Sequence, residues 1–173
     1  SLISAISETS SPASGGADGG GASPSSSGST RISLDVALLR QVVRGGETVL
    51  VPMEDGEVLR DGRGDRSAGD KFRIAFRASH ACFVYVVGVD ATGWVTPIFP
   101  SLHSRHSNPV EANRDYQLPD PEYAYSLNEY RGIEHVYFVA SHDRRGDIEQ
   151  LLGRFEGREQ PPPADETRVG EQT

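Results

Sequence analysis

The sequence predicts a mainly β domain: an antiparallel, β-sandwich-like fold of about six to eight strands with one C-terminal α-helix. Three observations lead to this prediction. Short segments in the middle of the chain alternate apolar and polar residues, Gly, Pro and Asn separate these segments, and only one late segment has helical spacing. We expect the folded domain to span residues 31–156, between a disordered Ser/Gly-rich linker at residues 1–30 and a disordered Pro-rich, acidic tail at residues 157–173.

Residues 82–100 form the clearest pair of predicted strands. The first strand is apolar on both faces, which is typical of an interior strand covered on two sides. A turn follows, in which the Asp90 carboxylate caps the backbone and Gly93 takes a positive φ. Pro97 cannot donate a ladder hydrogen bond, so we expect the second strand to lie at a sheet edge.

The segments before this hairpin are less regular. Residues 32–36 alternate as a strand does, but the apolar residues up to Gly45 also recur at helical spacing. We therefore predict a short strand followed by a segment of undecided structure. Residues 47–53 predict a second strand. Residues 71–77 alternate between an apolar and a basic face, which predicts a half-exposed strand with solvated arginines.

The segments after the hairpin are a loop, a strand and a helix. Residues 101–116 are polar and predict a long surface loop with a short strand at its end, whereas residues 133–141 predict a strand with two apolar faces. Residues 147–155 predict the helix, because their apolar residues follow the i, i+3, i+4, i+7 spacing. We expect this helix to cover an edge or an end of the sandwich.

The linker contains one short apolar cluster, formed by Leu2, Ile3 and Ile6. The remainder of residues 1–30 is mostly Ser, Gly and Ala, which buries too little apolar surface to offset chain entropy. We expect a flexible linker, and a docking role for the apolar cluster is the alternative.

Composition narrows the function. The net charge is −8, with 17 Lys and Arg against 25 Asp and Glu, which gives no basic surface for nucleic acid or anionic lipid. Cys82 is the one cysteine, so no internal disulfide exists and we expect a buried, inert thiol. No apolar run is long enough to form a transmembrane segment.

Motifs for chemistry are weak in this sequence. His103 and His106 suggest zinc, but their polar loop has no CxxC or HExxH frame, so we expect surface histidines and no metal site. The tripeptide at residues 63–65 spells an adhesion motif, and the acids at residues 54–65 lack EF-hand spacing, so we expect solvated loops for both. Because no G-x-S-x-G and no phosphate-binding glycine motif occurs, we expect no catalytic residue, no cofactor and no enzymatic activity.

Tyrosines are the candidate contact surface for a protein partner, since tyrosine is enriched in protein interfaces. The alternative, which we favour, is that their rings close one end of the sandwich. The four residues are Tyr116, Tyr123, Tyr125 and Tyr130.

Several short motifs follow one another in a fixed order. A Gly-Asp pair precedes a strand, an aromatic strand and a glycine turn come next, and Phe-Pro, Asn-Pro, Leu-Pro, Gly-x-Glu and Ala-Ser follow. Together they resemble the bacterial DUF4384 family, a domain of unknown function, over about residues 45–156. We expect structural roles for the residues that carry the resemblance, with Glu134 paired to an arginine. These residues are Gly69, Asp70, Tyr85, Gly93, Phe99, Pro100, Asn108, Pro109, Leu118, Pro119, Gly132, Glu134 and Ser141.

The resemblance implies an accessory β-domain of the kind found on exported or membrane-linked bacterial proteins and appended to kinase-like or caspase-like enzymes. We therefore expect a non-enzymatic binding or assembly module of a larger bacterial protein or envelope-associated complex, with a protein partner. The alternative is a regulatory or substrate-recognition domain of an enzyme whose catalytic part is absent from this chain. We expect an exported or membrane-tethered location, with a cytoplasmic one as the alternative.

Overall fold

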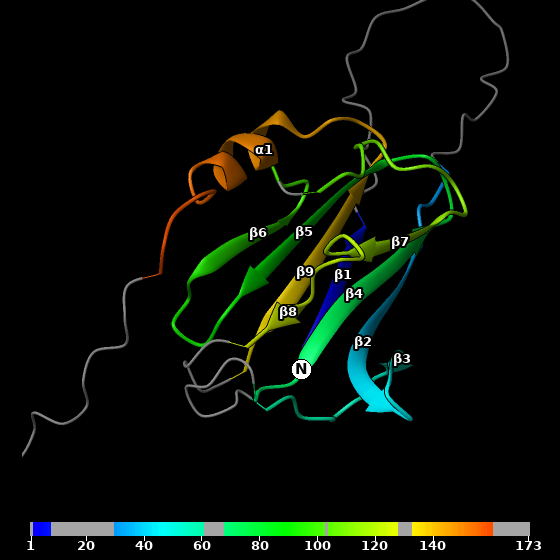
Figure 1. Cartoon of the computed structure of the whole chain (residues 1–173). Coiled ribbons are helices and arrows are strands. Elements are labelled where there is room, and N and C mark those ends of the chain that lie inside the picture. The colour runs from blue at the N-terminus through cyan, green and yellow to red at the C-terminus, as the bar shows by residue number, and fades with distance from the viewer. Residues whose placement is uncertain (1, 8–29, 61–67, 103, 128–132, 161–173) are drawn as a thin grey trace, which may run out of the picture.

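The computed structural model describes residues 2–7, 30–60, 68–102, 104–127 and 133–160, in which nine strands form two sheets and one helix follows them. Figure 1 shows the two sheets as layers that pack face to face. The predicted mainly β fold with a single C-terminal helix is confirmed.

The first sheet has the strand order β1-β9-β5-β6. Strand β5 lies inside this sheet, and β6 lies at its edge, as the apolar faces of β5 and Pro97 in β6 predict. The pairs β9–β5 and β5–β6 are antiparallel, whereas β1–β9 is parallel. The bounds are β1 (Leu2–Ser7), β5 (Phe83–Val89), β6 (Val95–Phe99) and β9 (His135–Ser141).

The second sheet has the order β3-β2-β4-β7, with β8 paired beside the start of β4. Strand β2 is a single strand of 11 residues, so the undecided segment after residue 36 is strand and not helix. Gly45 and Gly46, with φ of 60° and 85°, make the two-residue turn into β3. The bounds are β2 (Leu34–Arg44), β3 (Glu47–Pro52), β4 (Lys71–Ala78), β7 (Asp115–Leu118) and β8 (Tyr125–Ser126).

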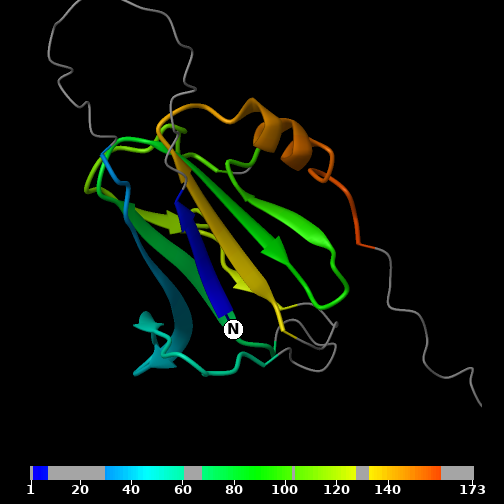
Figure 2. The ribbon, with the colours of Figure 1, turned by 180° about the vertical axis from the view of Figure 1, so that it is seen from behind.

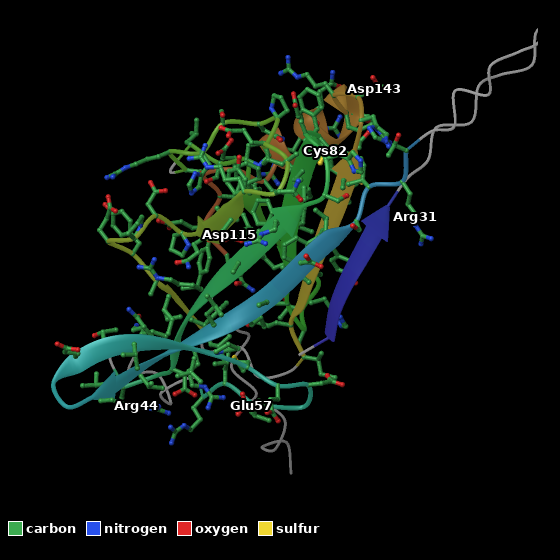
Figure 3. All side chains as sticks on the ribbon, turned by 90° about the vertical axis from the view of Figure 1, so that its right-hand side faces the viewer. Arg31, Arg44, Glu57, Cys82, Asp115 and Asp143 are labelled. Atoms are coloured by element: carbon green, nitrogen blue, oxygen red, sulfur yellow. The ribbon has the colours of Figure 1, made fainter. Side chains whose placement is uncertain are left out.

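The core lies between the two sheets, where the inward residues of alternating strands meet. Phe76 of β4 is central, with ring centroids 5.1 Å from Tyr116, 5.9 Å from Phe99 and 6.2 Å from Phe138. Cys82 is also buried, and burial raises the pKa of its thiol, which fits the predicted inert role. Figure 3 places Cys82 near one end of the sandwich.

Two expectations about exposure are wrong. The segment of residues 101–116 is not only a surface loop, because Val110 is 1% exposed and forms a β-bridge with Cys82. The basic face of β4 is not simply solvated either. Arg73 is 6% exposed and donates a hydrogen bond to the carbonyl of Pro121, because the chain after β7 folds over this face.

The helix α1 (Gly146–Gly153) packs on the outer face of the first sheet, at the end where β5 begins (Figure 1). The Tyr85 side chain points to this face and is fully buried. Its hydroxyl accepts a hydrogen bond from the Arg145 backbone N–H at 2.8 Å and donates one to Glu149 at 3.3 Å. Of the predicted apolar stripe, Leu152 is buried and Leu151 is half exposed.

Both terminal segments differ from the expected linker and tail where the structure describes them. Residues 2–7 form β1, and the remainder of the expected linker, residues 8–29, lies outside the described residues. At the other end, Gln160 donates a hydrogen bond to Asp90, so Gln160 lies against the β5–β6 turn. Residues 161–173 lie outside the described residues.

Candidate binding site

The outer edge of β9 is the feature of this fold best suited to binding. Strand β9 is rigidly placed, because Phe138 and Ala140 are fully buried and seven of its residues pair with β5. Its other edge pairs with β1, which lies alongside β9 in Figure 2. Without β1, this edge would present unpaired N–H and C=O groups, which are a template for another extended segment.

The β1–β9 pairing is regular, and in the described topology β1 pairs with no strand other than β9. Six consecutive pairs run from Leu2 opposite His135 to Ser7 opposite Ala140, in parallel orientation. No short turn connects such a parallel neighbour to β9, so it is held there through the backbone hydrogen bonds of the ladder. Strand β1 is therefore positioned as an added strand and not as part of a local hairpin.

The chain between β1 and β2 begins and ends at one corner of the sheet. Ser7 lies opposite Ala140, and the Thr30 carbonyl oxygen lies 2.6 Å from His142 Nε2, two residues further along. Pairing of two segments that lie far apart in the sequence costs chain entropy. This cost opposes the pairing of β1, so the same edge is open to competition from a segment that binds it better.

A cavity of about 150 Å³ lies between the sheets near the start of β9. Its walls include the apolar side chains of Phe72, Ile98 and Val136. Gly88 leaves space on the β5 side, where an added Cβ would lie 3.3 Å from Ile98 Cδ1. The volume equals that of about five liquid waters, which is enough for the end of one side chain.

Glu134 is the ionisable group of greatest interest in this cavity. Burial first, and the Asp90 carboxylate second, raise the pKa of Glu134 above its usual range. The expected arginine partner is not found, since no ion pair of Glu134 exists among the residues that the structure describes. A cation placed beside this carboxylate would stabilise its charged form and so oppose the rise of its pKa.

Asp90 and Tyr125 complete the polar lining. Burial alone would raise the pKa of Asp90, but hydrogen bonds from Thr92, Gln160 and Trp94 outweigh it and lower that pKa. Burial and the charge of Asp120 raise the pKa of the Tyr125 phenol to about 12, so this group stays protonated and neutral. Of the two carboxylates that line the cavity, Asp90 accepts hydrogen bonds within the β5–β6 turn and Glu134 does not.

The four predicted contact tyrosines do not form one surface. Tyr116 is 4% exposed and stacks on Phe76, so it belongs to the core. The Tyr125 ring packs 5.6 Å from Phe72 and closes one end of the sandwich. Tyr123 is 62% exposed, and Tyr130 lies outside the described residues. Burial of Tyr116 excludes its ring from an exposed contact surface, whereas Tyr125 is half-buried and lines the cavity.

The expected family resemblance is supported by a direct match. Residues 67–144 match the model of DUF4384, a domain of unknown function. Over this segment the chain is similar to DUF4384. Neither the curated proteins nor the solved structures contain a match to this chain. The matched segment holds β4 to β9, and therefore the cavity and the outer edge of β9, but not β1, β2 or β3.

Several residues that carry the resemblance to DUF4384 lie in turns or make hydrogen bonds to the backbone. Gly93 has a φ of 81° and donates to the Asp90 carbonyl, while the Asp90 carboxylate accepts the Thr92 and Trp94 N–H groups. Asp70 accepts from the Arg60 N–H at 2.8 Å. The bonds before Pro100, Pro109 and Pro119 are cis, Ser141 is buried, and Gly132 lies outside the described residues.

Asn108 is the signature residue whose contacts are most specific. Its side-chain oxygen accepts the Val84 N–H at 3.0 Å, and its side-chain nitrogen donates to the Val84 carbonyl at 2.9 Å. The amide thus pairs with β5 as a neighbouring strand would. Sequence reasoning places Asn108 in a surface loop and expects a structural role for it, but does not predict this contact with β5.

The remaining motifs gain no chemistry from the structure. No group of three or more metal-ligating side chains occurs among the described residues. His103 and the tripeptide at residues 63–65 lie outside them, and His106 packs against the Tyr116 ring at 5.2 Å. No helix in the described part of the chain is long and apolar enough to cross a membrane.

Sequence reasoning does not predict the pairing of Leu2–Ser7 with the outer edge of β9. The signal was the apolar cluster of Leu2, Ile3 and Ile6, which was assigned to a linker because its neighbours are Ser and Gly. The partner strand of this cluster lies more than a hundred residues away in the chain, so no local pattern could identify it.

Proposed function

We propose that this domain is a non-enzymatic binding module of a larger bacterial protein, and that it receives an extended protein segment along the outer edge of β9. The observation that carries the proposal is the parallel pairing of Leu2–Ser7 with β9. Strand addition supplies affinity through backbone hydrogen bonds, and side chains at alternate positions supply selectivity.

The position of β1 supports this use of the edge. Strand β1 lies outside the matched DUF4384 segment, whereas β9 lies inside it. The matched segment thus contains the strand β9 that offers the edge, whereas β1, like β2 and β3, lies outside the match. A segment of a partner protein would pair with β9 in the same way as β1 does, and so would a segment from another part of the same polypeptide. A regulatory domain that holds a segment of a catalytic part would use the same edge.

The test uses the full chain with β1 disabled. Every second residue of β1 donates its N–H to β9. Ser4→Pro together with Ala5→Pro therefore removes one of these donors, whichever of the two residues it belongs to. A fluorescent, acetylated and amidated SLISAIS peptide should bind this double-proline variant saturably. It should bind the wild-type chain much more weakly, because tethered β1 competes at a millimolar effective concentration.

Two controls isolate strand pairing from general stickiness. The same two-proline change at Ser25 and Ser26, between β1 and β2 in the sequence, should leave the wild-type behaviour unchanged. A peptide SLIPPIS, which lacks the central donors, should not bind. The proposal fails if the double-proline variant keeps its circular dichroism spectrum and does not bind SLISAIS, or if it binds both peptides equally.

A further inference from the structure

The start of β9 offers a basis for selecting which segment is bound. Pairing with β1 begins where Leu2 lies opposite His135. The residue of the receiving chain one step earlier is Glu134, which lines the cavity between the sheets together with Val136. Residues two apart in an extended chain face the same side, so Glu134 and Val136 both face this cavity.

A bound segment that extends one residue further would therefore place a side chain beside Glu134. Directly opposite residues of paired strands project to the same face of the sheet. The side chain that precedes the paired stretch would thus enter the same space as the Glu134 carboxylate. In the present sequence Ser1 precedes the stretch, and it lies outside the described residues.

The surroundings of Glu134 favour a long, cationic side chain at this place. The apolar walls from Phe72, Ile98 and Val136 suit an aliphatic stem, and the Glu134 carboxylate suits the charged end. The Asp90 carboxylate adds negative charge nearby, although its oxygens already accept hydrogen bonds from Thr92, Trp94 and Gln160. An acidic side chain at the same place would meet two carboxylates and be repelled.

We infer that the β9 edge selects an extended protein segment in which Lys or Arg immediately precedes the paired stretch. This inference rests on the proposed function, since it requires that a segment binds the edge at all. It adds the chemistry of the partner: a cation is attracted, and an acid is rejected at the same position. Selection of this kind combines an attractive and a repulsive element.

The experiment compares four acetylated and amidated peptides on the full-length double-proline variant: SLISAIS, KLISAIS, MLISAIS and ELISAIS. Blocked termini prevent a terminal charge from imitating lysine. Met supplies an apolar stem without a charge. Opposite charges on directly opposed strand residues contribute up to about 1 kcal/mol, so KLISAIS should bind roughly fivefold more tightly than MLISAIS. ELISAIS should bind most weakly.

Two further variants assign the preference to Glu134. Glu134→Gln should reduce the difference between KLISAIS and MLISAIS to less than twofold, because the amide carries no charge. Asp143→Asn is the matched control, since Asp143 is an exposed acid just beyond the opposite end of β9 (Figure 3), and the preference for lysine should remain.

The outcomes separate this inference from the proposed function. If all four peptides bind equally, or if the preference for KLISAIS survives in Glu134→Gln, the selection by Glu134 is refuted while strand addition stands. If no peptide binds the folded double-proline variant, both are refuted. A preference for lysine that Glu134→Gln removes and Asp143→Asn retains is the result that we expect.

Discussion

Asn108→Ala should destabilise the domain strongly, because the Asn108 side chain pairs with a buried stretch of β5. The substitution removes the 3.0 Å bond from the Val84 N–H and the 2.9 Å bond to the Val84 carbonyl. Val84 is fully buried, so water cannot readily replace either partner. A buried polar backbone group that loses its partner costs about 1–3 kcal/mol, so two such groups give a loss of roughly 3 kcal/mol or more.

The assay is equilibrium urea unfolding of the full chain, followed by circular dichroism. A loss of about 3 kcal/mol should lower Tm by roughly 10 °C in a domain of this size and shift the urea midpoint without changing the slope. Gln117→Ala is the matched control, since Gln117 is an exposed residue of β7, and its effect should stay within about 0.5 kcal/mol. If Asn108→Ala also stays within about 0.5 kcal/mol of the wild type, the strand-like role of the Asn108 amide is refuted.

Three further substitutions test the outer face of the first sheet and the cavity. Tyr85→Phe leaves the Arg145 N–H without its acceptor and should lower the free energy of unfolding by about 1–2 kcal/mol, and an unchanged urea midpoint would contradict the contact between β5 and α1. Glu134→Gln should stabilise the chain at pH 7. Because the pKa of Glu134 is raised in the folded state, the wild-type chain loses stability as the pH rises from the ordinary value of 4.5 through the raised one. The stabilisation by Glu134→Gln should therefore vanish at about pH 4. Equal stabilisation at pH 4 and pH 7 would contradict the raised pKa. Asp90→Asn should destabilise the chain at pH 7, and the difference should narrow as the pH falls below the ordinary value of 3.8 through the lowered pKa of Asp90. A difference that is independent of pH in urea titrations would contradict the lowered pKa.

Local patterns predict the β5–β6 hairpin well because its determinants are local. The alternation of apolar residues sets the strands, and the turn depends only on the Asp90 carboxylate and the positive φ of Gly93. Strand β2 was not predicted in full, since its apolar residues satisfy both strand and helix spacing. The segment forms a strand because it pairs with β3 and β4, and the spacing of its apolar residues does not reveal this pairing.

Burial of polar residues could not be predicted from alternation. Arg73 lies on the face of β4 opposite to the core, as its position predicts, but the chain after β7 covers it. Tyr116 follows a polar loop, so the sequence leaves open whether its ring is exposed or closes one end of the sandwich, and the ring stacks on Phe76 in the core. Both outcomes depend on where a loop crosses a sheet.

The candidate site combines a predicted part and an unpredicted part. The strand at residues 135–141 and the inward direction of Glu134 follow from the period of two. The use of the opposite edge by Leu2–Ser7 depends on a parallel register between segments at the two ends of the chain, and neither segment encodes that register alone.

Hydrogen exchange at the backbone amides of β9 tests the central claim most directly. In the wild-type chain, the β9 amides that face β1 should be protected, and in the Ser4→Pro, Ala5→Pro variant they should exchange faster. The amides that face β5 should stay protected in both, and added acetyl-SLISAIS-amide should restore protection to the variant. Equal exchange of the β1-facing amides in both chains, or no restoration by the peptide, would contradict the role of β9 as a receiving edge.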